Sequence, residues 1–128
     1  MKKFNDTSPI YVQLKQEVED SILAGALKTD EVIQSIRTLA LQYSINPLTV
    51  SKAISELEND GVIYKKRGIG FFVAPEAQTN IRKQRLKAYL EKDVKDFVHK
   101  AIQLGIELPA ILNLIKTTYE EETHVSTI

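Results

Sequence analysis

The 128-residue sequence contains no cysteine and only two histidines, His99 and His124. Without cysteine there can be no disulfide, no thiolate nucleophile and no cysteine-ligated zinc or iron–sulfur site. A metal or acid–base role for histidine needs companions, and His99 has only Lys95 and Asp96 one turn before it, which is typical of a helix surface. We therefore predict that the protein is not an enzyme and holds no metal and no cofactor.

The sequence also lacks a long apolar run and an excess of charge of one sign. No run reaches the roughly 18 apolar residues of a transmembrane helix, and residues 1–6 do not form the apolar region of a secretion signal. We expect a cytoplasmic protein with no membrane contact.

The 17 basic and 17 acidic residues balance, so the net charge is zero. This balance excludes a protein that coats nucleic acid through net positive charge, but it permits a local basic face.

Two helices are predicted at the start of the chain. Ser8, a capping residue, followed by Pro9 at the first helical position predicts a helix over residues 9–24, and Gly25 is placed to end it. After a polar linker, Ser35 can cap a short second helix that ends near Tyr43.

A third helix is predicted to begin at Pro47, because Asn46 and Pro47 repeat the pattern of a cap followed by proline. Gly61 is placed to end this helix. Its inward stripe consists of Val50, Ala53, Ile54 and Leu57. Two short helices joined by so brief a turn form a helix-turn-helix pattern.

A β-hairpin is predicted next, because residues 62–66 and 71–73 are β-prone runs that flank Gly68 and Gly70. A hairpin directly after a helix-turn-helix is a wing. The predicted fold class is therefore mainly α with a small β-hairpin wing, with a winged helix-turn-helix domain at residues 1–75.

Residues 76–128 are predicted to form a two-helix dimerisation tail. Apolar residues recur at helical spacing over residues 78–104, Gly105 breaks the pattern, and Pro109 can start a second helix that ends before the acidic residues 120–122. A domain of about 70 residues cannot cover so long a stripe, so we expect it to pack against a second chain. The alternative is a lid on the chain's own winged domain. The expected interface residues are Leu90, Val94, Phe97, Val98, Ala101, Ile102, Leu108, Ile111, Leu112 and Ile115.

The order of motifs over residues 8–75 resembles the DNA-binding domain of the GntR family of bacterial regulators. The motifs are Pro9-Ile10-Tyr11-Val12-Gln13-Leu14, Ser35-Ile36-Arg37-Thr38-Leu39-Ala40, Ile45-Asn46-Pro47 with the helix that follows, Leu57-Glu58-Asn59-Asp60-Gly61, and Arg67-Gly68-Ile69-Gly70-Phe71. The form of the turn and the short tail are similar to the YtrA subfamily, which lacks the large effector-binding domain of other branches. The resemblance implies a transcriptional repressor that binds a pseudo-palindromic operator as a homodimer; no residue pattern defines a small-molecule effector.

Several positions depart from the family pattern. The family's Pro-Gly after the first helix is Thr29-Asp30, and the proline before the Ser35 motif is Gln34, so we expect this loop to be less rigid. Leu48 replaces a polar residue of the recognition helix, and Phe71 replaces a small residue at the wing tip. Leu48 is expected either to contact a thymine methyl group or to pack on the second helix.

DNA contacts are predicted in the first turn of the second helix, at the start of the third helix and in the wing. Helix N-termini and small hydroxyls can donate to phosphates, and Lys52 can reach a phosphate or a guanine edge. Arg37 resembles the family's arginine that enters the groove, and the wing's charges are expected at the minor groove. The predicted DNA-binding residues are Ser35, Arg37, Asn46, Leu48, Thr49, Ser51, Lys52, Lys65, Lys66, Arg67, Gly68 and Gly70. The alternative is a winged-helix protein-interaction module with no DNA role.

Overall fold

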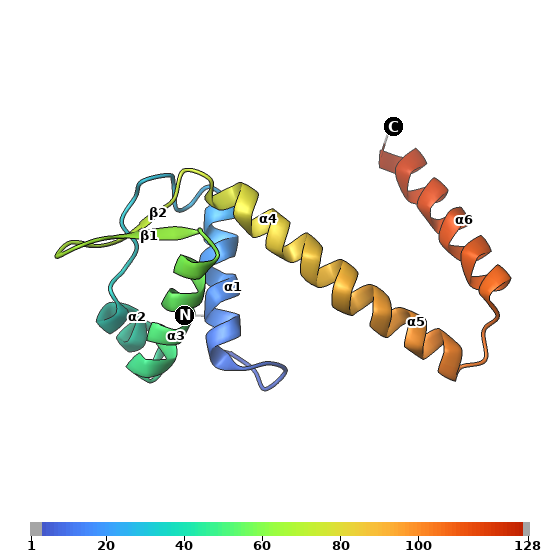
Figure 1. The fold of residues 1–128 in the computed structure, drawn as a ribbon, viewed down its shortest axis with the longest axis horizontal. Coiled ribbons are helices and arrows are strands. Elements are labelled where there is room, and N and C mark those ends of the chain that lie inside the picture. Colours follow the sequence, from blue (N-terminus) through green and yellow to red (C-terminus); the bar gives the residue numbers. More distant parts are fainter. Residues whose placement is uncertain (1–3, 127–128) are drawn as a thin grey trace. The chain divides into compact units, whose positions relative to one another are not determined.

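The computed structural model describes residues 4–126 as two compact units, one ending at Arg85 and the other beginning at Leu86. The elements of the first part are α1 (Ile10–Leu23), α2 (Ile36–Tyr43), α3 (Pro47–Asn59), β1 (Ile63–Lys66) and β2 (Gly70–Val73) (Figure 1). They are followed by α4 (Ala77–Ala88), the π-helical turn η1 (Tyr89–Asp93), α5 (Val94–Gln103) and α6 (Leu108–Ser126). The predicted class, mainly helical with one small hairpin, is confirmed.

The core of the first unit forms where α1 packs on α3. The side chains of Leu14 and Ile22 from α1 meet those of Val50 and Leu57 from α3, and all four are completely or almost completely buried. The predicted stripe of α3 is buried in full. Burial of apolar side chains at helical spacing is the main force that holds these helices together.

Two of the three predicted caps are confirmed. The Ser35 hydroxyl accepts a hydrogen bond from the Thr38 N–H at 3.1 Å, and the Asn46 side chain accepts one from the Leu48 N–H at 2.8 Å. The predicted cap at Ser8 is wrong. Pro9 takes the cap position with an extended backbone (φ −55°, ψ 143°) and makes no side-chain bond, so α1 begins one residue later, at Ile10.

The loop between α1 and α2 is tied to the hairpin by backbone hydrogen bonds, and the expectation that it is less rigid than in the resembled family stays a prediction. Its backbone makes three hydrogen bonds with β2: the N–H groups of Asp30 and Ile33 donate to Val73 and Phe71 at 2.8 and 2.9 Å, and the Val73 N–H donates to Glu31 at 2.9 Å. These bonds satisfy backbone groups along the second edge of β2. The loop thus pairs with β2 at one isolated bridge, between Val32 and Phe72.

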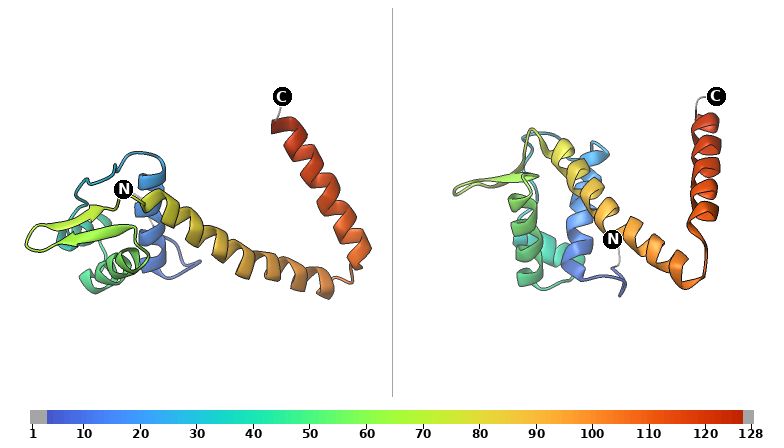
Figure 2. Two further views of the ribbon diagram at one scale, coloured as in Figure 1. Left: turned by 45° about the horizontal axis from the view of Figure 1, so that its top comes forward. Right: turned by 45° about the vertical axis from the view of Figure 1, so that its right-hand side comes forward.

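The hairpin forms the predicted wing. Its strands are antiparallel, with Ile63 opposite Val73 and Lys65 opposite Phe71. In all three views it projects on the side of α1 where α2 and α3 lie (Figures 1 and 2). The expectation that Phe71 lies at the wing tip is wrong, because Phe71 belongs to β2 and packs, partly buried, against the core.

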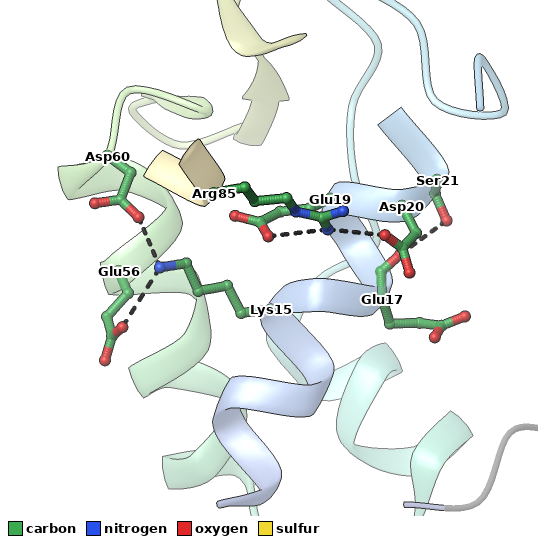
Figure 3. A network of polar contacts seen from close by, with 8 residues as sticks. All are labelled: Lys15, Glu17, Glu19, Asp20, Ser21, Glu56, Asp60 and Arg85. Atoms are coloured by element: carbon green, nitrogen blue, oxygen red, sulfur yellow. Dashed lines mark hydrogen bonds and ion pairs between the residues drawn. The ribbon is translucent and has the colours of Figure 1, made fainter. Parts of the chain in front are cut away.

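Helix α4 completes the first unit, which therefore extends beyond the predicted boundary at residue 75. Ala77 and Ile81 are buried in the core. The Asn80 amide donates to the Gly61 carbonyl at 2.9 Å. Arg85 contacts Glu19 at 3.3 Å and Asp20 at 2.8 Å (Figure 3). The sequence pattern could not show the boundary because one helix continues across it.

The second unit contains two helical segments separated by Gly105, which has a φ of 75° as its predicted role as a helix breaker requires. Contrary to the prediction, α6 does not end before the acidic residues 120–122 but continues to Ser126. Glutamate is a good helix former, so a run of it need not end a helix. No helix among residues 4–126 has the length and apolar character to cross a membrane.

Candidate nucleic-acid interface

The start of α2 presents one basic and two hydroxyl side chains, all exposed. Ser35 uses its hydroxyl as the cap of the helix and also donates to the Thr38 hydroxyl at 2.9 Å. Arg37 lies in the first turn, close to N–H groups that have no partner within the helix. A helix N-terminus beside a guanidinium attracts phosphate oxygens.

The start of α3 presents a second set of predicted residues. Asn46 caps the helix, Thr49 and Ser51 are half-buried, and Lys52 is exposed. Leu48 is 78% exposed. It therefore does not pack on α2, and its contact with a thymine methyl group stays a prediction.

Lys52 is held in place by an aromatic ring from another helix. Its ammonium nitrogen lies 4.1 Å from the centre of the Tyr11 ring in α1. Cations are attracted to the negative face of such a ring, and the contact limits the conformations of a long side chain. Tyr11 belongs to the Pro9-to-Leu14 motif, but no signal in the sequence connects it to Lys52.

The wing carries three exposed basic residues, Lys65, Lys66 and Arg67, next to a glycine turn. Gly68 and Gly70 have φ values of 79° and 145°, which L-amino acids with side chains rarely adopt. Between them Ile69 is 70% exposed at the tip, a feature the sequence analysis did not single out.

The described acidic side chains do not neutralise this surface. Among residues 4–126, Arg37, Lys52 and the wing's basic residues form no ion pair within 4.0 Å, whereas Lys15 and Arg85 do (Figure 3). Lys15 contacts Asp60 at 2.7 Å and Glu56 at 3.6 Å. Burial alone would lower the pKa of Lys15, but the hydrogen bond to Asp60 and the nearby carboxylates outweigh it and raise that pKa.

The second unit carries the predicted dimer-interface residues. Ala101 is buried and Ile111 is half-buried, whereas Phe97, Ile102 and the other predicted residues are exposed. Phe97 of α5 also lines an apolar hollow formed with α6; the other lining residues are Leu114, Ile115, Thr118, Tyr119 and Glu122. Leu114, which lines this hollow, is not among the predicted interface residues.

No group of histidine and acidic side chains within residues 4–126 could hold a metal ion.

Comparison with known proteins agrees with the arrangement described above. The family model described as "Bacterial regulatory proteins, gntR family" matches residues 10–73. The HTH-type transcriptional repressor YtrA of Bacillus subtilis is 33% identical over 110 residues, which cover 86% of this chain and 84% of that protein.

Two solved structures are also similar. A GntR-family transcriptional regulator from Bacteroides thetaiotaomicron, described as putative, matches with a TM-score of 0.68 at 33% identity, over 88% of this chain and 98% of its own. The AraR DNA-binding domain, solved in complex with operator ORX1, matches with a TM-score of 0.53 at 32% identity, over 56% of this chain and 92% of its own.

Proposed function

The chain belongs to the gntR family of bacterial regulatory proteins, and we propose that it acts in the cytoplasm as a homodimer that represses transcription from a pseudo-palindromic operator. Family membership makes it a transcriptional regulator with a DNA-binding domain, not an enzyme. One observation carries the proposal. The starts of α2 and α3 and the wing expose basic and hydroxyl side chains that form no ion pair with the described acidic residues.

We assign the reading of bases to α3 and α2. A recognition helix presents its N-terminal residues to the major groove, and here those residues are Leu48, Thr49 and Lys52, with Ser51 beside them. Thr49 and Ser51 donate to phosphate or base atoms, and Leu48 contacts a thymine methyl group. Arg37, at the start of α2, pairs with a guanine through its two terminal nitrogens.

We assign the wing to the phosphate backbone and the minor groove. Lys65, Lys66 and Arg67 supply charge, and the two glycines of the turn let the backbone approach the DNA closely. Contacts of this kind release counterions, and binding should weaken steeply as salt rises. Ser35 and Asn46 take part through the helix ends that they cap.

We assign dimerisation to the second unit, within the region 76–128. Its exposed apolar side chains on α5 and α6, among them Phe97, Ile102 and Ile115, are the kind of surface that a second copy would bury. Two copies related by a two-fold axis would place two recognition helices about one helical turn of DNA apart, or roughly 10 bp, or a multiple of it. The similarity to the repressor YtrA supports repression.

The proposal is tested by selecting bound sites from random duplexes with the purified full-length protein and then titrating the enriched site. We expect an inverted repeat, bound at least about 10³-fold more tightly than unrelated DNA. Arg67→Ala should weaken binding to all duplexes and reduce the slope of log affinity against log salt by about one. If no site is enriched and binding does not respond to salt, the winged domain is a protein-interaction module.

A further inference from the structure

Asp30 occupies a backbone conformation that normally requires glycine. Its φ is 63°, and it stands where the resembled family has the glycine of a Pro-Gly pair. Aspartate tolerates this region better than most residues because its short polar side chain can bond nearby groups. Here the carboxylate accepts a hydrogen bond from the Tyr64 hydroxyl of β1 at 2.8 Å. The unusual residue therefore provides something that glycine cannot, an acceptor for the wing.

Tyr64 connects this acceptor to the outer face of the wing. Its ring stacks on the ring of Phe72 in the paired strand, with 5.8 Å between the centroids and 23° between the planes. The ammonium of Lys66 lies 4.5 Å from the centre of the Phe72 ring and 6.0 Å from that of Tyr64. The two rings thus hold the wing lysine by a cation–π contact.

The same loop leads into the start of α2. Beyond Asp30, the loop pairs with β2 through the bridge between Val32 and Phe72, and the Ile33 N–H donates to the Phe71 carbonyl. Two residues later Ser35 caps α2, whose first turn carries Arg37. The loop therefore connects the wing directly to the helix end that presents the arginine.

From this chain of contacts we propose that Asp30 and Tyr64 are positioning residues for DNA binding: their hydrogen bond fixes the wing, with Lys66 on its aromatic pair, against the loop that leads to Arg37. Neither residue needs to touch DNA. The inference rests on the proposed function, since it assumes that the wing and Arg37 bind one duplex together. The free energy of the contact between Asp30 and Tyr64 is of the order of one hydrogen bond at a partly exposed site, and this sets the size of the expected effect.

The experiment titrates the full-length protein with its selected duplex. Tyr64→Phe removes the hydroxyl and keeps the ring stack. We expect the Kd to rise about two- to tenfold. The slope of log affinity against log salt should fall by about one, which corresponds to the loss of one phosphate contact. Asp30→Gly keeps the backbone conformation but removes the acceptor, so it should match Tyr64→Phe. Asp30→Asn keeps an acceptor oxygen and should bind nearly as the parent does.

Two double variants separate positioning from general stability. If the two residues act through one bond, Tyr64→Phe combined with Asp30→Gly should lose no more affinity than either alone. On a Lys66→Ala background, Tyr64→Phe should change the Kd less than it does in the parent, whereas any effect on the melting temperature should persist in full. The inference is overturned if the parent binds its site while Tyr64→Phe keeps the parent's Kd and salt slope, or if the losses in affinity add independently. A parent that binds no duplex overturns the proposed function itself.

Discussion

The ammonium of Lys52 lies over the ring of Tyr11, 4.1 Å from its centre, so that a residue of α1 holds a side chain of the recognition helix. We expect Tyr11→Leu to raise the Kd for the selected duplex about two- to fivefold, because an exposed cation–π contact contributes roughly 0.5–1 kcal/mol and Lys52 becomes freer without it. Tyr11→Phe keeps the ring and is the matched control. Tighter binding by Tyr11→Leu would show that the ring holds Lys52 away from the DNA.

Arg37 should carry base preference. Arg37→Ala is expected to cost on the order of 1–3 kcal/mol in specific binding and to relax the preference at one base position in each half-site. Repeating the site selection with the variant checks the second effect, and a duplex titration checks the first. Arg82→Ala, which removes an exposed arginine of α4, is the control and should change neither. If the sites selected by Arg37→Ala show the same base preference at every position as those of the parent, a direct contact between Arg37 and a base is excluded.

The local features of this fold were predictable because their causes are local. A capping residue before a helix and a glycine after it act within a few residues, so the caps Ser35 and Asn46 and the turn at Gly61 could be predicted from the sequence. The cap at Ser8 failed because Pro9 can itself adopt the cap conformation. The candidate DNA-binding residues at the starts of α2 and α3 can therefore be located in the sequence as well as the helix ends themselves can.

The contacts that hold side chains of the candidate site in position could not be predicted, because they join residues that are far apart in the chain. Tyr64 bonds to Asp30, Tyr11 holds Lys52, and neither pair leaves a periodic or compositional signal. The departure at Asp30 is visible in the sequence, but the hydrogen bond that this residue accepts from Tyr64 is not. The backbone hydrogen bonds between this loop and β2 likewise leave no signal in the sequence.

The buried carboxylate of Glu19 should make stability depend on pH. Glu19 is only 4% exposed, and burial raises its pKa although the hydrogen bond from Arg85 and the charge of Lys15 oppose the shift. The folded state then binds this proton more tightly than the unfolded chain. The stability contributed by this group is fully present below its unfolded pKa of about 4.3 and is lost as pH rises through its folded pKa.

Glu19→Gln removes this titration, so the variant's free energy of unfolding should increase relative to the parent's as pH rises above about 4.3. Urea unfolding of both proteins at several pH values between about 4 and 8 measures the difference, in which the other carboxyl groups largely cancel. A difference that stays constant, or that falls as pH rises, would mean that Arg85 outweighs burial and holds the carboxylate charged.

The residue at which the chain is truncated decides whether the remaining fragment keeps a complete core. A fragment that ends at residue 75 lacks Ala77 and Ile81, whose side chains are buried in the first core. Losing the isoleucine alone should cost about 2–5 kcal/mol. A fragment ending at Ala88 keeps both residues together with the Arg85 contacts to Glu19 and Asp20. We expect this longer fragment to fold and the shorter one to unfold at much lower denaturant.

If α5 and α6 form the dimer interface, the fragment ending at Ala88 should be monomeric, and its affinity for a duplex with two half-sites should fall by roughly 10²–10⁴ toward that for one half-site. In the full chain, Phe97→Asp with Ile102→Asp should have the same effect, because unpaired carboxylates in an apolar interface lose their hydration without gaining a partner. Light scattering and duplex titration of both proteins measure these effects. A double variant that stays dimeric would place the interface elsewhere, whereas a fragment that unfolds would identify the tail as a lid that completes the core of its own chain.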